Sequence, residues 1–143
     1  MPIEWSDNLK IGVGTIDSQH RELFARVAAF ESALDRGETG RIADTFAFLR
    51  EYALVHFAHE EQLMRESVYP GLDEHRAAHV QFVERLGALV RERETGVASA
   101  FLALRARNWI VVWLLEHVGG MDQALGRYLR GRGVPARGGA ARG

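Results

Sequence analysis

The feature that most constrains this chain is a pair of long proline-free segments whose apolar residues recur with helical spacing. Proline occurs only at positions 2, 70 and 135, and proline is the residue that interrupts a helix most strongly. Within the segments between them, apolar residues follow one another at steps of three and four, the period of a helix with one buried face. The chain is therefore expected to be all-α.

Glycines and one proline turn divide the chain into four expected helices, at about residues 18–36, 42–68, 72–95 and 98–129. Asp17 or Ser18 is the expected cap of the first helix, and Tyr69-Pro70-Gly71 forms the turn between the second and third. Four helices with short connections predict an up-down-up-down four-helix bundle, with an N-terminal arm of about 16 residues packed outside it.

The length and net charge of the chain limit the number of domains it can form and the classes of partner it can attract. The 143 residues, with a formal net charge of −1, fit one domain at 1–130, followed by a flexible Gly/Arg-rich tail at 131–143. A balanced charge offers no broad attraction to nucleic acid or to an anionic membrane surface. The N-terminus lacks the apolar segment of a signal peptide, and no apolar run approaches the ~18–20 residues that span a bilayer. A cytoplasmic protein without a membrane span is expected.

Polar residues interrupt the apolar faces of the expected helices. His56 and Glu60 lie four residues apart in the second helix, and His75 and His79 lie four apart in the third, so that each pair shares one face. Buried histidine and glutamate cost several kcal/mol, on the order of 2–7, unless they are paired or bind a metal. The first helix adds His20 to its apolar face, and the fourth adds His117, with Asp122 five residues later.

A single histidine on an apolar face is usually a hydrogen-bonded core residue, but five on four helices favour a metal site. Cysteine is absent, so any ligands are histidines and carboxylates. Five imidazoles and two carboxylates are too many for one tetrahedral zinc. Two six-coordinate first-row metals bridged by both carboxylates and an oxygen fit this set and leave one coordination position open for a small ligand.

The motifs that carry these residues resemble those of the single-domain bacterial hemerythrins, the non-haem di-iron oxygen-binding family. The resemblance covers about residues 3–130 and includes Trp5, Ile16-Asp17-Ser18-Gln19-His20, His56-Phe57-Ala58-His59-Glu60-Glu61-Gln62-Leu63-Met64, Tyr69-Pro70, His75 with His79, and Trp113-Leu114-Leu115-Glu116-His117 followed by Asp122. It implies that His75, His79 and His117 hold one iron, that His20 and His56 hold a second, five-coordinate iron, and that Glu60 and Asp122 bridge the two.

The same resemblance implies a function. A hemerythrin binds O₂ reversibly at two hydroxo- or oxo-bridged iron ions and holds it as hydroperoxide on the five-coordinate iron. This chain is therefore expected to be an oxygen carrier, store or delivery protein and not an enzyme, apart from weak oxidase or peroxidase side activity. Its expected partners are O₂ and an electron donor or an O₂-consuming protein. The alternatives are an oxygen or redox sensor, a di-iron oxidase or peroxide- or nitric-oxide-handling enzyme, and a simple iron or zinc store.

Residues one helical turn from the expected ligands predict the walls of an oxygen pocket. They are Phe24, Met64, Trp113 and Leu114. Phe57 and Trp109 are assigned to the general core, His59 to the surface or to a place behind a ligand, and Glu61 to solvent.

The step of five residues from His117 to Asp122 does not fit a regular helix, because it turns the two side chains about 140° apart. A π-type bulge at Gly119-Gly120 would bring them to one face, and such bulges are common at functional sites. The alternative is an unbroken helix whose apolar face continues through Met121.

Overall fold

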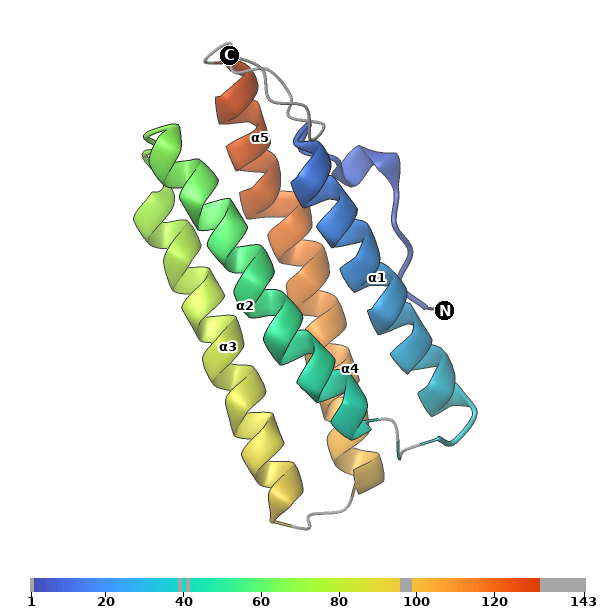
Figure 1. The fold of residues 1–143 in the computed structure, drawn as a ribbon. Coiled ribbons are helices and arrows are strands. Elements are labelled where there is room, and N and C mark those ends of the chain that lie inside the picture. Colours follow the sequence, from blue (N-terminus) through green and yellow to red (C-terminus); the bar gives the residue numbers. More distant parts are fainter. Residues whose placement is uncertain (1, 39, 41, 96–98, 132–143) are drawn as a thin grey trace.

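Four helical rods form the molecule (Figure 1). The structure is a computed structural model, which describes residues 2–38, 40, 42–95 and 99–131. The first three rods are α1 (Gly14–Asp35), α2 (Ile42–Glu66) and α3 (Leu72–Glu94), and the fourth consists of α4 (Ser99–Glu116), the turn η3 (His117–Met121) and α5 (Asp122–Gly131). Successive rods run in opposite directions (Figure 1), so the predicted all-α, up-down-up-down bundle is confirmed.

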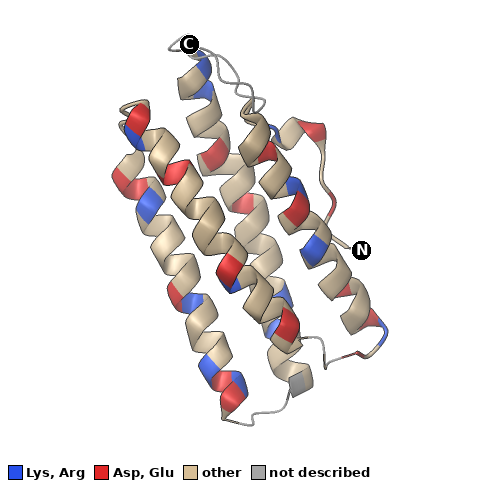
Figure 2. Ribbon diagram, in the orientation of Figure 1, with Lys and Arg blue, Asp and Glu red and all other residues tan. Residues whose placement is uncertain are grey.

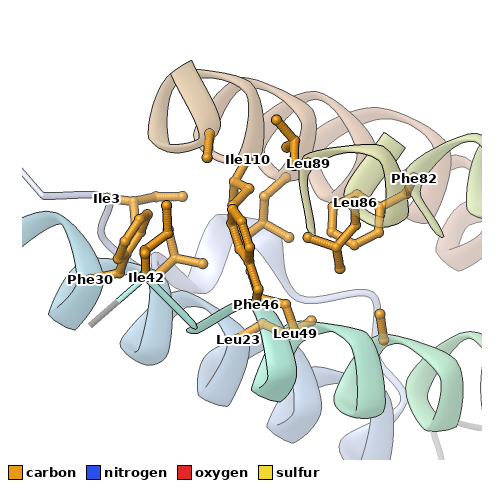
Figure 3. Packing of buried hydrophobic residues seen from close by; sticks show 14 of the residues in the cluster. Ile3, Leu23, Phe30, Ile42, Phe46, Leu49, Phe82, Leu86, Leu89 and Ile110 are labelled. Carbon is orange, nitrogen blue, oxygen red and sulfur yellow. The ribbon is translucent and has the colours of Figure 1, made fainter. Parts of the chain in front are cut away.

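Each rod packs against two others and buries one face. α1 contacts α2 and α4, and α3 contacts the same two helices, so all four surround a common axis. Figure 3 shows Phe46 and Leu49 of α2, Phe82 and Leu86 of α3 and Ile110 of α4 pointing into the interior between the helices, where they belong to one buried cluster. Burying a side chain of this size contributes about 1.5–3 kcal/mol, and this packing holds the helices in register around the polar residues described below.

The apolar core is divided into two parts along the bundle. A large cluster includes Phe24, Phe57, Leu114 and Val118. A smaller one near the N-terminus of α1 and along α5 consists of Ile11, Val13, Ile16, Leu63, Met64, Leu125 and Leu129. In each rod, apolar residues that come shortly before or after the candidate ligands in the sequence belong to these two apolar clusters or pack against them. Apolar side chains therefore pack around the polar centre and exclude water from it.

The first helix begins earlier than expected. α1 starts at Gly14 after Val13, and neither Asp17 nor Ser18 is its cap. Instead Asp17 accepts hydrogen bonds from the backbone N–H of Ile11 (2.8 Å) and of Gly12 (3.2 Å). Burial of Ile16 in the smaller cluster explains the extra turn, since the helix must continue past Asp17 to place that side chain inside.

Residues 2–13 form an arm outside the bundle, as expected, with a short 3₁₀ turn η1 (Asp7–Leu9). The backbone N–H of Ile3 donates to Glu31 of α1 at 2.6 Å. Gly126 of α5 lets the arm approach closely, since a Cβ there would lie 2.8 Å from the Ile11 carbonyl oxygen. The predicted tail falls almost wholly outside the described residues, at 132–143. Within the described part of the chain, none of the helices combines the length and apolar character that crossing a membrane requires.

Candidate metal centre

All seven candidate ligands are buried and come together from the four rods. His20 comes from α1, His56 and Glu60 from α2, His75 and His79 from α3, His117 from η3 and Asp122 from the start of α5. His117 is the most exposed of them, at 6 %, and His20, Glu60 and Asp122 are fully buried. Each element contributes ligands on the side that faces the bundle axis.

The ligand atoms form two groups that share both carboxylates. In each group the potential ligand atoms lie within 4.8 Å of one another; the groups are Glu60, His75, His79, His117 and Asp122, and His20, His56, Glu60 and Asp122. Three imidazoles thus lie on one side of the two carboxylates, and two imidazoles lie on the other.

Glu60 divides its two oxygens between these groups. Its Oε2 lies 3.1 Å from His20 Nε2 and 3.0 Å from His56 Nε2. Its Oε1 lies 3.3 Å from His75 Nε2 and 3.1 Å from His79 Nε2. One oxygen therefore faces the pair of histidines, and the other faces the group of three.

The two oxygens of Asp122 are shared between the two groups of histidines in the same way. Its Oδ2 lies 3.1 Å from His20 Nε2, whereas its Oδ1 lies 2.9 Å from His75 Nε2 and 3.3 Å from His117 Nε2. A carboxylate that presents one oxygen to each of two imidazole groups has the geometry of a bridge between two cations.

The polar atoms of this centre are poorly satisfied by one another, which is the behaviour expected of a metal site. The Nε2 atoms of His75 and His79 lie 3.1 Å and 3.2 Å from the same atom of His117, and three nitrogens facing one another cannot all carry protons. Within the described residues, Glu60 Oε1 and both Asp122 oxygens are buried and accept no well-aligned hydrogen bond, although imidazole nitrogens lie 2.9–3.3 Å from them. Buried groups of this kind require compensation, and imidazole nitrogen with carboxylate oxygen suits first-row transition metals.

In the protein without metal, the carboxylates hold protons on two of the histidines. Burial by itself would lower the pKa of His20, but the close contacts with the negatively charged Asp122 and Glu60 raise it to about 10. Burial likewise lowers the pKa of His75, but the contacts with Asp122 and Glu60 outweigh it and raise that pKa to about 9.

The carboxylates shift in the opposite direction. Burial favours the neutral form of Glu60, but the charge of His56 and hydrogen bonds from His20, His56 and His75 hold its pKa well below the usual range. Burial and the negative charge of Glu60 by themselves would raise the pKa of Asp122. The interactions with His117 and His20 outweigh both effects, so the pKa of Asp122 also lies below its usual range. Both carboxylates are therefore ionised at neutral pH.

Two of the histidines are oriented from behind by hydrogen bonds to their outer nitrogen. His79 Nδ1 lies 2.8 Å from Glu61 Oε2, and His56 Nδ1 lies 2.8 Å from Gln19 Oε1. With both rings donating from Nδ1, each Nε2 lone pair is left free for a metal. The Gln19 amide in turn donates to Nδ1 of the exposed His59 at 2.7 Å, which is consistent with the expectation for His59.

Glu61 was expected in solvent, and this is wrong. Its side chain is 18 % exposed and contacts His79 of the neighbouring helix. Spacing along one helix could not reveal this contact, because it depends on how α2 and α3 face each other.

Replacing Glu61 with alanine is expected to weaken metal binding. Loss of a hydrogen-bond partner behind a metal-bound histidine typically lowers metal affinity about 10- to 100-fold, and Glu61 contributes a negative charge as well. Competition with a chelator of known affinity measures the effect. The control is Glu51→Ala, at an exposed position of the same helix, and equal affinities in the two variants would contradict the role of Glu61.

The turn η3 is a π-helical turn, as predicted for Gly119-Gly120. The Asp122 N–H donates to the carbonyl oxygen of His117, five residues earlier. His117 and Asp122 thereby reach the same centre, and the alternative of an unbroken regular helix is wrong. A Cβ at Gly119 would have Leu9 Cδ2 as its nearest contact, at 3.9 Å, and a Cβ at Gly120 would meet nothing within 4 Å, so steric space does not require glycine in this turn.

A small cavity borders the centre. It has a volume of about 20 Å³ and is lined by His20, Leu23, Val27, Leu49, Ala53, His56, Phe57, Phe82, Ile110, Trp113, Leu114, His117, Val118 and Asp122. This space is sufficient for a molecule about the size of water. Trp113 and Leu114, two of the four residues predicted to wall an oxygen pocket, are on the wall of this cavity. Phe24 and Met64 are not: Phe24 packs against Trp5, with ring centres 5.5 Å apart, and Met64 belongs to the smaller apolar cluster.

Two aromatic rings that line this cavity stack on candidate ligand histidines. Trp113 stacks on His117, with ring centres 4.4 Å apart and an interplanar angle of 11°. Phe57, assigned from the sequence to the general core, stacks on His79 at 3.8 Å and 5°. Trp109 lies in the core as expected, stacked on Phe82 at 5.0 Å. The rings of Trp113 and Phe57 fix the orientation of two candidate ligands and keep water from them.

Five histidines and two acids at the centre of a four-helix bundle define a metal-binding bundle protein. Residues 11–129 match the family described as Hemerythrin HHE cation binding domain. The bacteriohemerythrin of Stenotrophomonas maltophilia is 32 % identical over 123 residues, covering 84 % of this chain and 76 % of the relative. The myohemerythrin of Riftia pachyptila is 30 % identical over 121 residues, covering 85 % and 88 %. The chain belongs to the hemerythrin family.

A solved structure supports the same assignment. The crystal structure of a leucine-to-tyrosine mutant of hemerythrin superposes with a TM-score of 0.73 at 25 % identity, covering 90 % of this chain and 98 % of the other. Hemerythrins are oxygen-binding non-haem iron proteins and not enzymes. The predicted family, fold and class of protein are thus confirmed.

Proposed function

We propose that this protein binds O₂ reversibly at two iron ions and serves as an oxygen carrier, store or delivery protein. His75, His79 and His117 would hold one iron and His20 and His56 the other, with Glu60 and Asp122 between them. The observation that carries the proposal is the division of each carboxylate, one oxygen toward three imidazoles and the other toward two. The side with two imidazoles has fewer protein donors, and the coordination position for O₂ belongs there.

The charge of the ligand set favours release of O₂ over its further reduction. Two Fe(II) ions carry +4, and two carboxylates with one hydroxide carry −3, which leaves a formal charge of about +1. Di-iron sites in ferritin-like proteins take a larger share of carboxylates. Neutral imidazoles stabilise high-valent iron less than anionic oxygen ligands do, so the centre is suited to return to its reduced state.

The chain supplies an apolar chamber next to that position. His20 and His56 border the cavity together with Leu23, Val27 and Leu114. These aliphatic walls admit a small apolar molecule and exclude water and anions, which would promote loss of electrons from the centre. Two ferrous ions would supply the two electrons, and the bridging hydroxide the proton, that convert O₂ to hydroperoxide; both would be returned on release. The ligand in this proposal is O₂. The protein partner is an electron donor, which would keep the irons reduced, or a protein that consumes the O₂ that is released.

Anaerobic reduction followed by exposure to air tests the proposal. We expect about two irons per chain and a visible charge-transfer band of an oxygenated di-iron centre, which disappears when O₂ is removed and returns when it is readmitted. A band that fails to form in protein with two irons would exclude reversible binding. Steady consumption of O₂ with a reductant would instead support the oxidase alternative, and one zinc per chain would support a metal store.

A further inference from the structure

The outward face of α4 is apolar, although it is exposed. Phe101 is 62 % exposed, Leu104 46 %, Val112 53 % and Leu115 44 %. These four residues, together with the exposed Asn108 between them, are called the α4 face here. Contiguous apolar patches of a few hundred Å² on a soluble domain commonly mark an interaction surface.

The α4 face also lacks free charge. Figure 2 shows many charged residues along α1, α2 and α3 and fewer along α4. The charged residues of α4 are Arg105, Arg107 and Glu116. Arg105 pairs with Glu92 of α3, and Arg107 lies 3.5 Å from Asp35 of α1. Both cations are thus engaged within the chain, and Glu116 lies at the end of the helix. A partner for this face must itself be apolar and nearly uncharged where it touches.

The apolar residues of the α4 face are arranged symmetrically about Asn108. Leu104 and Val112 are each four residues from it, and Phe101 and Leu115 are each seven residues from it. In an antiparallel pair of identical helices centred on Asn108, residue 104 of one copy faces residue 112 of the other, and residue 101 faces residue 115. A two-fold interface requires a surface that is self-complementary in this way, and one buried Asn commonly fixes the register of paired helices.

The size of the face fits a reversible dimer. Four half-exposed side chains offer on the order of 400 Å² of apolar surface per copy. With the surrounding rim, two copies would bury about 1,000–1,200 Å², at the low end of specific interfaces. We propose that the α4 face is the contact of a two-fold symmetric, antiparallel dimer of this chain, with α4 packed against α4 of the second copy.

A single cysteine tests the geometry, because the chain contains none. Asn108→Cys is expected to form a disulfide-linked dimer under mild oxidation, since the two-fold axis places residue 108 beside its own copy. The control, Val55→Cys, at a residue of α2 that is 55 % exposed, should remain mostly monomeric. A double variant with Leu104→Cys and Val112→Cys should cross-link, whereas Leu104→Cys alone should do so weakly. Strong cross-linking of Leu104→Cys alone would overturn the antiparallel arrangement.

The oligomeric state of the unmodified chain tests the dimer itself. Sedimentation velocity over a range of concentrations should show a monomer–dimer equilibrium, and Leu104→Glu should raise its dissociation constant at least 10-fold. Leu54→Glu, at a residue that is 50 % exposed on α2, should leave it unchanged. A chain that stays monomeric at every concentration, or a dimer weakened equally by both variants, overturns the proposal. Binding of the α4 face to neutral phospholipid vesicles in place of a second copy would also overturn it.

Discussion

Glu60→Ala is expected to remove the di-iron centre. Its two oxygens face the two histidine groups, so its loss takes one anionic donor from each iron at once. Iron content should fall from about two per chain to below one, and the visible band of the oxygenated form should disappear. Removing one partner from a buried charged network typically costs about 3–5 kcal/mol, so the metal-free protein should also unfold at lower denaturant concentration.

A second substitution separates loss of the carboxylate from loss of packing. Glu60→Gln keeps the volume of the side chain but lacks the negative charge, and it should bind less than one iron while retaining the helical content of the parent. Glu51→Ala, at an exposed position of the same helix, should change neither iron content nor stability. A Glu60→Ala protein that keeps two irons and a reversible band would show that Glu60 does not bridge.

The bundle could be predicted from the sequence because its helices are defined by local patterns. The start of α3 follows directly from the turn at Tyr69-Pro70-Gly71, and the observed α2 begins at the expected Ile42. The start of α1 could not be placed in this way. Asp17 looks like a helix cap in the sequence, and its actual role in binding the amides of the arm depends on where Ile16 is buried.

The centre could be predicted to the extent that its residues share a helix face. His56 with Glu60, and His75 with His79, follow from steps of four, and the misfit of five between His117 and Asp122 indicated the π-helical turn. Contacts between helices carry no such signal. Glu61 reaches His79 across the gap between α2 and α3, and Phe57 stacks on the same ring, which only the packed structure reveals.

Without metal, the protein is expected to be most stable between about pH 5 and pH 8. The pKa of His20 is raised to about 10 and that of His75 to about 9. Their contribution to stability is therefore complete below the unfolded value of 6.5 and is lost as the pH rises through 9 to 10. The pKa values of Glu60 and Asp122 are lowered, so their contribution is present above about pH 4.5 and is lost as the pH falls. Urea unfolding of the metal-free protein from pH 4 to pH 10 measures the loss of stability at both the acidic and the basic end of this range.

Metal uptake by this protein should therefore release protons. A histidine must be neutral to bind a metal, and at pH 7 the raised pKa values keep His20 and His75 protonated in the metal-free state. Loading with Zn²⁺ or Fe²⁺ at pH 7 should release about two protons per chain from these two rings, and a bridging hydroxide formed from water would add a third. The apparent affinity should rise with pH until about pH 9–10. Titration calorimetry in buffers of different ionisation enthalpy counts the protons. Metal-free His20→Ala should release about one fewer, whereas binding to the unmodified chain without proton release would show that the carboxylates do not hold protons on these rings.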